Sequence, residues 1–173
     1  MDYQRITETH AADLRLPNDT FELFGRMIVS RIEEKWQYRT VFFDTVETMV
    51  FPDENYTYKE VNEKGFAVGA YDGKNCIGLA IFEHHWAGYA YLQDLKVNKA
   101  YRKQGVAGEL IAKGLELAKE NGYHGLFTIG QDNNLAACLF YLKQGFVIGG
   151  LNTKSYQHTQ QEGKSDIYFY LEG

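Results

Sequence analysis

The segment Arg102-Lys103-Gln104-Gly105-Val106-Ala107-Gly108 decides how the rest of the sequence is interpreted. It follows an apolar stretch, 88–97, that is typical of a strand, and it leads into a stretch, 105–121, with apolar residues at helical spacing. Backbone N–H groups at a helix start have no partner within the helix, and the helix dipole adds partial positive charge. Glycines permit close approach of the backbone, and Arg102 and Lys103 add charge. The segment therefore predicts a site for a pyrophosphate.

The residues of this loop leave one alternative open, which is an ordinary helix start with solvated basic side chains. The loop lacks the Gly-Lys-Ser/Thr ending of a Walker A motif, and it lacks the Gly-x-Gly-x-x-Gly of a dinucleotide site. An anion bound here would therefore be held by a loop that differs from the commonest nucleotide-binding motifs.

The remaining pattern predicts a sheet with helices packed on it. Residues 21–51 are hard to assign: Phe24, Met27, Ile28, Ile32 and Trp36 suit a helix face, and the run from Trp36 to Phe43 then looks like a strand. Asp72-Gly73 is a hairpin turn signal. We expect one domain, 1–173, of the α/β or α+β class. The predicted strands are 65–71, 76–82, 88–97, 125–129, 146–149 and 167–171, and the predicted helices are 105–121 and 134–144.

Composition and charge argue against several other classes of protein. No apolar run approaches ~18 residues, so no membrane-spanning helix and no membrane partner are expected. The N-terminus lacks the apolar stretch of a secretory signal. The net charge of -5 disfavours a nucleic-acid partner. Cys76 and Cys138 form no disulfide framework or metal motif, and His84-His85 would point to opposite faces of a strand. We therefore expect a cytoplasmic protein without a metal.

Two blocks of the sequence resemble the GNAT family of N-acetyltransferases. Leu95-x-Val97 followed by Tyr101-Arg102-Lys103-Gln104-Gly105-Val106-Ala107 looks like the acetyl-CoA loop of that family, Arg/Gln-x-x-Gly-x-Gly/Ala. Asn134-x-x-Ala137-x-x-x-Tyr141-x-x-x-Gly145-Phe146 looks like its second-helix motif. The resemblance implies the GNAT fold, with a mixed central sheet whose strands splay at the acetyl-CoA site. It also implies acetyl-CoA as the acetyl donor and CoA as a product.

The same resemblance implies which residues hold the cofactor. The strand before the loop would pair its backbone with the pantetheine arm, and the amides of Gln104 to Gly108 would hold the pyrophosphate. The implied cofactor residues are Leu95, Lys96, Val97, Arg102, Lys103, Gln104, Gly105, Val106, Ala107, Gly108, Asn134, Ala137 and Tyr141.

Candidate catalytic residues follow from the chemistry of acetyl transfer, which needs a neutral amine and a proton for the leaving thiolate. Tyr141 matches the family's general acid, because a phenol with a pKa near ~10 keeps its proton at neutral pH; the alternative is a core aromatic. The base is less well defined. Some family members carry Glu-Asp where this chain has Gln93-Asp94, and an amide cannot act as a base. Asp94 is a candidate, although strand alternation predicts that it faces away from Gln93 and is structural; Glu83 is another.

The acceptor is suggested by a wider resemblance, which runs from about residue 20 to the C-terminus and is weakest between 40 and 65. We expect Trp36, Trp86, Gln93 and Ile129 to contact the acceptor. The segments that carry the resemblance look like streptothricin acetyltransferases, which acetylate a cationic antibiotic: Phe24-Gly25-Arg26-Met27-Ile28, Trp36, Trp86-x-Gly88-Tyr89-Ala90 and Gln131-Asp132-Asn133-Asn134-Leu135-x-Ala137-Cys138-x-Phe140-Tyr141.

Departures from that pattern bear on specificity. Gln93, Ile129 and Asn152 stand where those enzymes carry acids, and Lys154 replaces an apolar residue. Loss of three carboxylates and gain of one cation would weaken attraction for a polycation, which leads to the hypothesis that the acetyl-transfer chemistry is retained while the acceptor has changed. The expected function is acetylation of a primary amine of a small molecule such as a streptothricin-like antibiotic. A protein or peptide N-acetyltransferase and a non-catalytic acetyl-CoA-binding module are the alternatives. Because GNAT chains are often dimers, a homodimer is one expectation.

Overall fold

The computed structural model describes residues 1–173, which form two compact units. Unit 1 comprises residues 1–20, 50–126 and 173, and unit 2 comprises residues 21–49 and 127–172. The main sheet has the strand order β1-β4-β5-β6-β7-β9-β8, and a separate two-stranded sheet pairs β2 with β3. The mixed α/β sheet with helices packed on it, as the sequence predicted, is confirmed.

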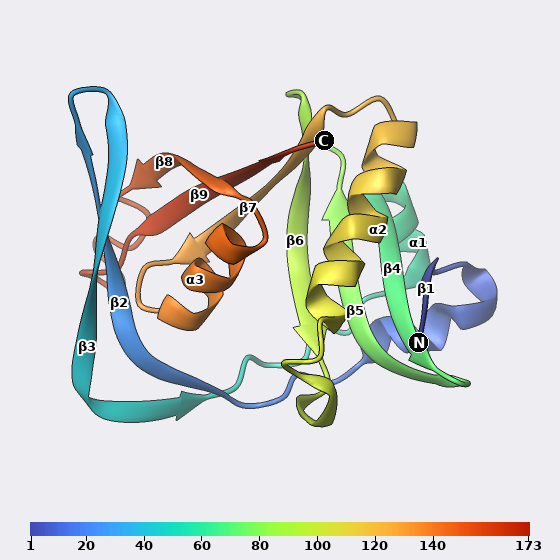
Figure 1. Cartoon of the computed structure of the whole chain (residues 1–173). Coiled ribbons are helices and arrows are strands. Elements are labelled where there is room, and N and C mark those ends of the chain that lie inside the picture. Colours follow the sequence, from blue (N-terminus) through green and yellow to red (C-terminus); the bar gives the residue numbers. More distant parts are fainter. The chain divides into compact units, whose positions relative to one another are not determined.

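Unit 1 is built on an antiparallel run of four strands (Figure 1). Its central strands are apolar along their whole length and buried on both faces, so a helix must cover each face. The hairpin between the central strands turns at Gly73, which has a φ of +60°. The elements are β1 (Asp2–Arg5), η1 (Glu8–Arg15), α1 (Tyr58–Lys64), β4 (Gly65–Asp72), β5 (Asn75–Glu83), β6 (Tyr89–Val97), η2 (Lys99–Tyr101) and α2 (Val106–Glu120).

Successive residues of β5 point to opposite faces and therefore meet different helices. On one face, the ring of Phe82 lies so close to α2 that a Cβ at Gly114 would overlap it. On the other face, Leu79 and Ile81 belong to a buried cluster with Val61 of α1. The glycine at 114 thus lets α2 pack closely on the strands that lead to the predicted cofactor loop.

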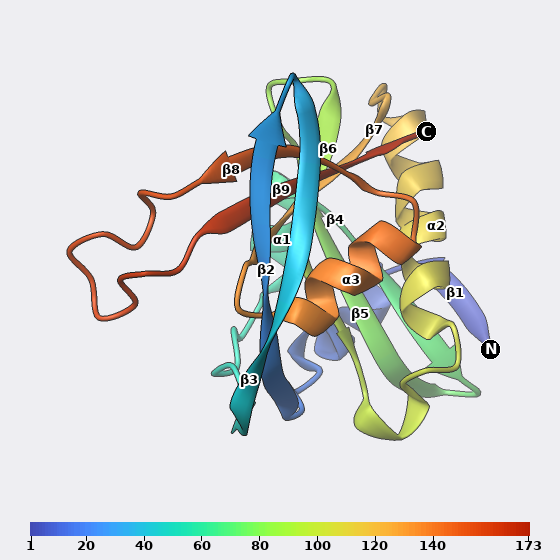
Figure 2. The same cartoon turned by 60° about the vertical axis from the view of Figure 1, so that its left-hand side comes forward.

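Unit 2 combines a long hairpin, one helix and three strands (Figure 2). Glu33 and Glu34 form the hairpin turn, both with positive φ, as a type I′ turn requires. The helix packs on β2, where a Cβ at Gly25 would lie 2.6 Å from Leu135 Cδ2. The elements are β2 (Phe21–Ile32), β3 (Lys35–Met49), β7 (Gly125–Gln131), α3 (Leu135–Lys143), β8 (Val147–Asn152) and β9 (Asp166–Glu172), with β7 beginning in unit 1.

The prediction of a helix face over residues 24–36 is wrong, because this segment forms β2 and the start of β3, whereas the strand predicted from Trp36 to Phe43 is confirmed as part of β3. The buried side chains of β2 follow a period of two, at Leu23, Met27 and Val29 with Gly25 between them. The half-exposed face of β2 also carries the large apolar residues Phe24 and Ile28, so apolar residues of the two faces together have the spacing of a helix. No helix of the structure combines the length and the apolar character needed to span a membrane.

Candidate functional site

The predicted site residues divide between the two units, and each set is described within its own unit. Unit 1 holds the strand and loop before α2 together with the candidate bases and Trp86. Unit 2 holds Trp36, Ile129 and the second motif, with Asn134, Ala137 and Tyr141.

The predicted strand–loop–helix unit is confirmed, with α2 beginning directly after the loop. Gly105 precedes the first helical residue and has a φ of 85°, a left-handed conformation that favours glycine. No side chain caps this helix start. The first N–H groups of α2 therefore lack both an intrahelical acceptor and a capping oxygen, and the helix dipole favours an anion beside them.

Side chains of the loop donate hydrogen bonds to nearby backbone carbonyls of unit 1. Arg102 donates from Nε to the carbonyl of Val97 at 3.1 Å and from Nη1 to the carbonyl of Thr20 at 2.7 Å. Gln104 donates to the carbonyl of Ala100 at 3.1 Å. These bonds fix the course of the loop after β6. An anion site at this point would thus be formed mainly by backbone amides. Arg102 would stabilise the loop, because its Nε and Nη1 already donate to backbone carbonyls.

A bulge in β6 changes the orientation expected for Gln93 and Asp94. Ile81 pairs with Asp94 and Phe82 pairs with Leu92, so Gln93 has no residue opposite it on β5. The hydroxyl of Tyr56 lies 3.0 Å from Gln93 Oε1 and 3.0 Å from Asp94 Oδ2. The expectation that Asp94 faces away from Gln93 is therefore wrong, because the bulge brings both side chains to one tyrosine.

Asp94 also belongs to a charged cluster around the side chain of Lys96. The Lys96 ammonium lies 2.7 Å from Glu54 and 3.4 Å from Asp94, and it donates to the carbonyl of Leu16. The lysine side chain is only 8% exposed. Its ammonium is thus committed to this cluster, which leaves the backbone of Lys96 as its means of contacting a cofactor.

Burial and hydrogen bonding act on these groups in opposite directions. Burial raises the pKa of Asp94, although Lys96 and the Tyr56 hydroxyl each oppose the rise. Burial likewise raises the pKa of Glu54, but hydrogen bonds from Lys96 and Asn18 outweigh it, so the pKa of Glu54 is lowered. Burial raises the pKa of Tyr56, and the charge of Asp94 raises it further. Asp94 is therefore the carboxylate of this cluster that takes up a proton more readily.

Tyr56 and Glu54 are members of this cluster that sequence reasoning missed. Both lie in the stretch between 40 and 65, where no motif and no clear period marks any residue. A contact between residues 56 and 94 depends on the fold of unit 1. The sequence offered one sign of it, an aromatic residue among polar ones, and that sign does not identify the partner.

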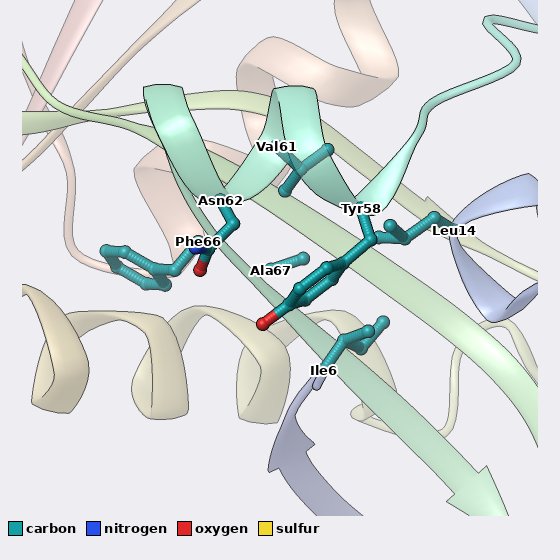
Figure 3. Close-up of a pocket in the computed structure, with 7 residues that line it drawn as sticks. All are labelled: Ile6, Leu14, Tyr58, Val61, Asn62, Phe66 and Ala67. Atoms are coloured by element: carbon teal, nitrogen blue, oxygen red, sulfur yellow. The ribbon is translucent and has the colours of Figure 1, made fainter. Parts of the chain in front are cut away.

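The other candidates of unit 1 lie in and after β5. Glu83 is the last residue of β5 and pairs with Tyr91 of β6. Trp86 is 92% exposed, and its ring lies 5.6 Å from that of His85. A separate small pocket of unit 1 contains none of the predicted site residues, and it lies between α1, β1 and β4 (Figure 3). It is lined by Ile6, Leu14, Tyr58, Val61, Asn62, Phe66 and Ala67.

In unit 2, the second motif begins with a helix cap. Asn134 Oδ1 accepts a hydrogen bond from the backbone N–H of Ala137 at 3.3 Å, which explains the spacing of these two residues. Before it, buried Asp132 accepts from Arg26 at 2.7 Å and from the Ser165 amide at 3.1 Å. Between them, Asn133 Oδ1 is buried without a hydrogen-bond partner. A ligand donor at this oxygen would satisfy it, so the start of α3 suits a bound polar chain.

Tyr141 lies on α3 within a group of aromatic rings. Its ring centroid is 5.5 Å from those of Phe140, Phe146 and Phe169. The residue is half-buried, so these contacts orient the ring without enclosing it. They fit both interpretations made from the sequence, a core aromatic and an oriented phenol.

Three further predicted positions lie on strands of unit 2. Trp36 is half-buried in β3, with the guanidinium of Arg31 5.5 Å from its ring. Ile129 is half-buried in β7. Asn152 ends β8, and its Oδ1 accepts from the amides of Lys154 and Ser155, a turn that an aspartate could also form.

Comparison with known proteins gives consistent similarities. The sequence model of the acetyltransferase (GNAT) family matches residues 31–146. Streptothricin acetyltransferase A of Bacillus subtilis is 35% identical over 167 residues, which cover 96% of each protein. A Bacillus anthracis protein assigned as a streptothricin acetyltransferase, solved with acetyl coenzyme A, has a TM-score of 0.88 and 28% identity over 99% of this chain and 98% of its own. A nourseothricin acetyltransferase shares the fold, with a TM-score of 0.78 and 23% identity over 99% and 97%.

Proposed function

This chain belongs to the GNAT family of acetyltransferases, and we propose that its acceptor is a primary amine of a streptothricin-like antibiotic. The chain is an acetyl-CoA-dependent N-acetyltransferase that acts on a small molecule. The similarity to Streptothricin acetyltransferase A over nearly the whole chain is the single observation that carries the proposed acceptor.

The assignment of cofactor residues is supported by the two helix starts. The uncapped start of α2, with Gly105 in a left-handed conformation, suits a pyrophosphate held by amides from Gln104 to Gly108. The unpartnered Asn133 Oδ1 beside Asn134 and Ala137 suits a donor from the pantetheine arm. Leu95 and Val97 lie on β6, and their backbone groups would pair with that arm. Acetyl-CoA, when bound, supplies the acetyl group as a thioester.

The protein's own groups would then act on protons. An ordinary phenol keeps its proton at neutral pH, so Tyr141 would serve as the donor of a proton to the leaving sulfur. Asp94, with its pKa raised by burial, is the better placed of the two candidate bases, because the β6 bulge brings it to Gln93 and Tyr56. Glu83 stays the second candidate. Gln93 itself can accept a hydrogen bond from the amine but cannot take its proton.

The acceptor contacts and the wider context belong to the same proposal. Trp36, Trp86, Gln93 and Ile129 would contact the antibiotic, and an aromatic face suits a cationic group. A cytoplasmic location is supported by two free cysteines, Cys76 and Cys138. A homodimer is the proposed assembly.

The acceptor is tested by measuring thiol release from acetyl-CoA with streptothricin, aminoglycosides, polyamines and peptide amines. Streptothricin should give the highest kcat/KM, and mass spectrometry should find one added acetyl group on its amine. A higher kcat/KM with a peptide amine would refute the proposed acceptor. Absence of turnover with every amine, despite tight binding of acetyl-CoA, would instead indicate a binding module.

A further inference from the structure

Strand β3 has an exposed outer edge and two exposed faces. It runs from Lys35 to Met49 and pairs only with β2, so its other edge presents unpaired backbone groups (Figure 1). An edge strand of this length is normally shortened, covered or interrupted, because it offers a template for another strand. Every residue from Gln37 to Thr48 is exposed. β3 is therefore the least covered strand of the chain.

In the segment 35–42 of β3, aromatic side chains lie on one face and mostly polar side chains lie on the other. Tyr38 and Phe42 share a face, because they pair with Val29 and Gly25 of β2, and Val41 lies on the opposite face. Phe42 is 68% exposed and Val46 is 54% exposed. Exposed aromatic side chains of this size on an edge strand would gain contacts from the side chains of a further strand paired beside it. The missing neighbour would thus pair edge to edge with β3.

The charges of β3 indicate what that neighbour is. Lys35 and Arg39 are the charged residues of the segment 35–42, and Asp44 and Glu47 are those of the segment 43–49. The pairing with β2 shifts register between these two segments, because Leu23 faces Glu47 whereas Gly25 faces Phe42. A two-fold axis at this shift would place each basic segment against the acidic segment of a second copy. β3 is thus complementary in charge to itself when it runs antiparallel.

We propose that β3 is the interface at which two copies of this chain associate, with the two β3 strands antiparallel and basic segments facing acidic ones. The inference rests on the homodimer of the proposed function and specifies its surface. Backbone pairing along the open edges would supply attachment, and the exposed aromatic side chains would contact cross-strand neighbours on the second copy. The opposed charges would set the antiparallel direction.

The test uses charge reversal on the full chain, followed by sedimentation velocity. The wild-type protein should have twice the monomer mass of 19.9 kDa. Lys35→Glu with Arg39→Glu makes β3 wholly acidic, and Asp44→Lys with Glu47→Lys makes it wholly basic. Each double variant should be monomeric, an equimolar mixture of the two should form a heterodimer, and the quadruple variant should be a homodimer again.

Controls separate the interface from net charge and from folding. Lys59→Glu with Lys143→Glu reverses two exposed lysines outside β3 and should leave the dimer intact. Equal melting temperatures across the set would show that monomers are folded. Dimers that persist in both β3 variants would overturn the proposed surface while leaving a homodimer standing. A wild-type monomer at every concentration would overturn both, and neither result bears on acetyl transfer, which thiol release measures independently.

Discussion

The hydroxyl of Tyr56 donates a hydrogen bond to Asp94, with 3.0 Å between Oη and Oδ2. This bond stabilises the ionised carboxylate and opposes the rise in the pKa of Asp94 that burial causes. Lys96, 3.4 Å from the same carboxylate, acts in the same direction. After burial and the charges of Lys96 and Glu54, Tyr56 is thus a further group that sets the pKa of Asp94, although it lies 38 residues away in the sequence.

Tyr56→Phe should move the acid limb of the kcat/KM profile to higher pH. The substitution removes a hydrogen bond to the charged form, so the already raised pKa of Asp94 should rise further, and the ionised base should be lost at a higher pH. The lost bond should also lower the free energy of unfolding by about 1 kcal/mol. Tyr58→Phe is the matched control, because Tyr58 lines the separate pocket of Figure 3. Identical pH profiles for Tyr56→Phe and wild type would exclude Asp94 as the base.

Gly105→Ala should raise the KM for acetyl-CoA while lowering the free energy of unfolding only slightly. The φ of 85° is unfavourable for alanine and should cost about 1 kcal/mol, a fall in Tm of about 2–4 °C for a chain of this size. A shift of the backbone to relieve this strain would move the amides at the start of α2. We expect the KM for acetyl-CoA to rise about tenfold, equivalent to about 1.4 kcal/mol.

Gly73→Ala provides the comparison for this variant. Gly73 has a φ of +60° in the hairpin turn, and at both glycines a Cβ would meet nothing within 4 Å. Both variants should therefore lose similar stability through backbone conformation alone, whereas Gly73→Ala should keep the wild-type KM for acetyl-CoA. Equal KM values for the two variants would argue against a cofactor site at Gly105.

Tyr141→Phe should lower kcat and leave the KM for acetyl-CoA nearly unchanged. The phenylalanine ring keeps the contacts with Phe146 and Phe169, so the change removes chiefly the phenol proton. Loss of a general acid typically reduces the rate by about 100-fold or more. Tyr168→Phe, at a half-buried tyrosine of β9, should retain activity. An unchanged kcat in steady-state assays of Tyr141→Phe would leave Tyr141 with a structural role only.

Much of the fold could be predicted because local signals and tertiary packing agree over residues 65–171. Asp72-Gly73 marks a real turn, and the apolar stripe that begins at Val106 marks a real helix. Residues 21–32 were misassigned because Phe24 and Ile28 add apolar side chains to the half-exposed face of β2, which obscures its period of two. Intrinsic pattern cannot separate helix from strand where both faces are apolar.

The sequence predicted the parts of the candidate site that depend on local backbone conformation better than the parts that depend on contacts between distant side chains. Gly105 shows its role in the sequence, because a left-handed residue before a helix favours glycine. The shared orientation of Gln93 and Asp94 could not be predicted from the sequence, because it depends on a bulge in the pairing of β5 with β6 that interrupts strand alternation. Tyr56 reaches Asp94 only through the fold of unit 1. Contacts between residues distant in sequence were the part that composition and spacing could not supply.

Asn152→Asp should raise kcat/KM for a polycationic acceptor and have little effect with a monocationic one. Asn152 Oδ1 accepts from the amides of Lys154 and Ser155, and an aspartate oxygen can accept the same bonds, so the turn should persist. The substitution restores one of the three carboxylates that the resemblance to streptothricin acetyltransferases leads us to expect. A charge near a surface contributes at most about a few kcal/mol, so the gain should be about tenfold and should shrink as salt rises. Streptothricin and a simple monoamine, compared at low and high ionic strength, provide the measurement. A gain of equal size for both acceptors, or one insensitive to salt, would mean that position 152 does not select the acceptor by charge.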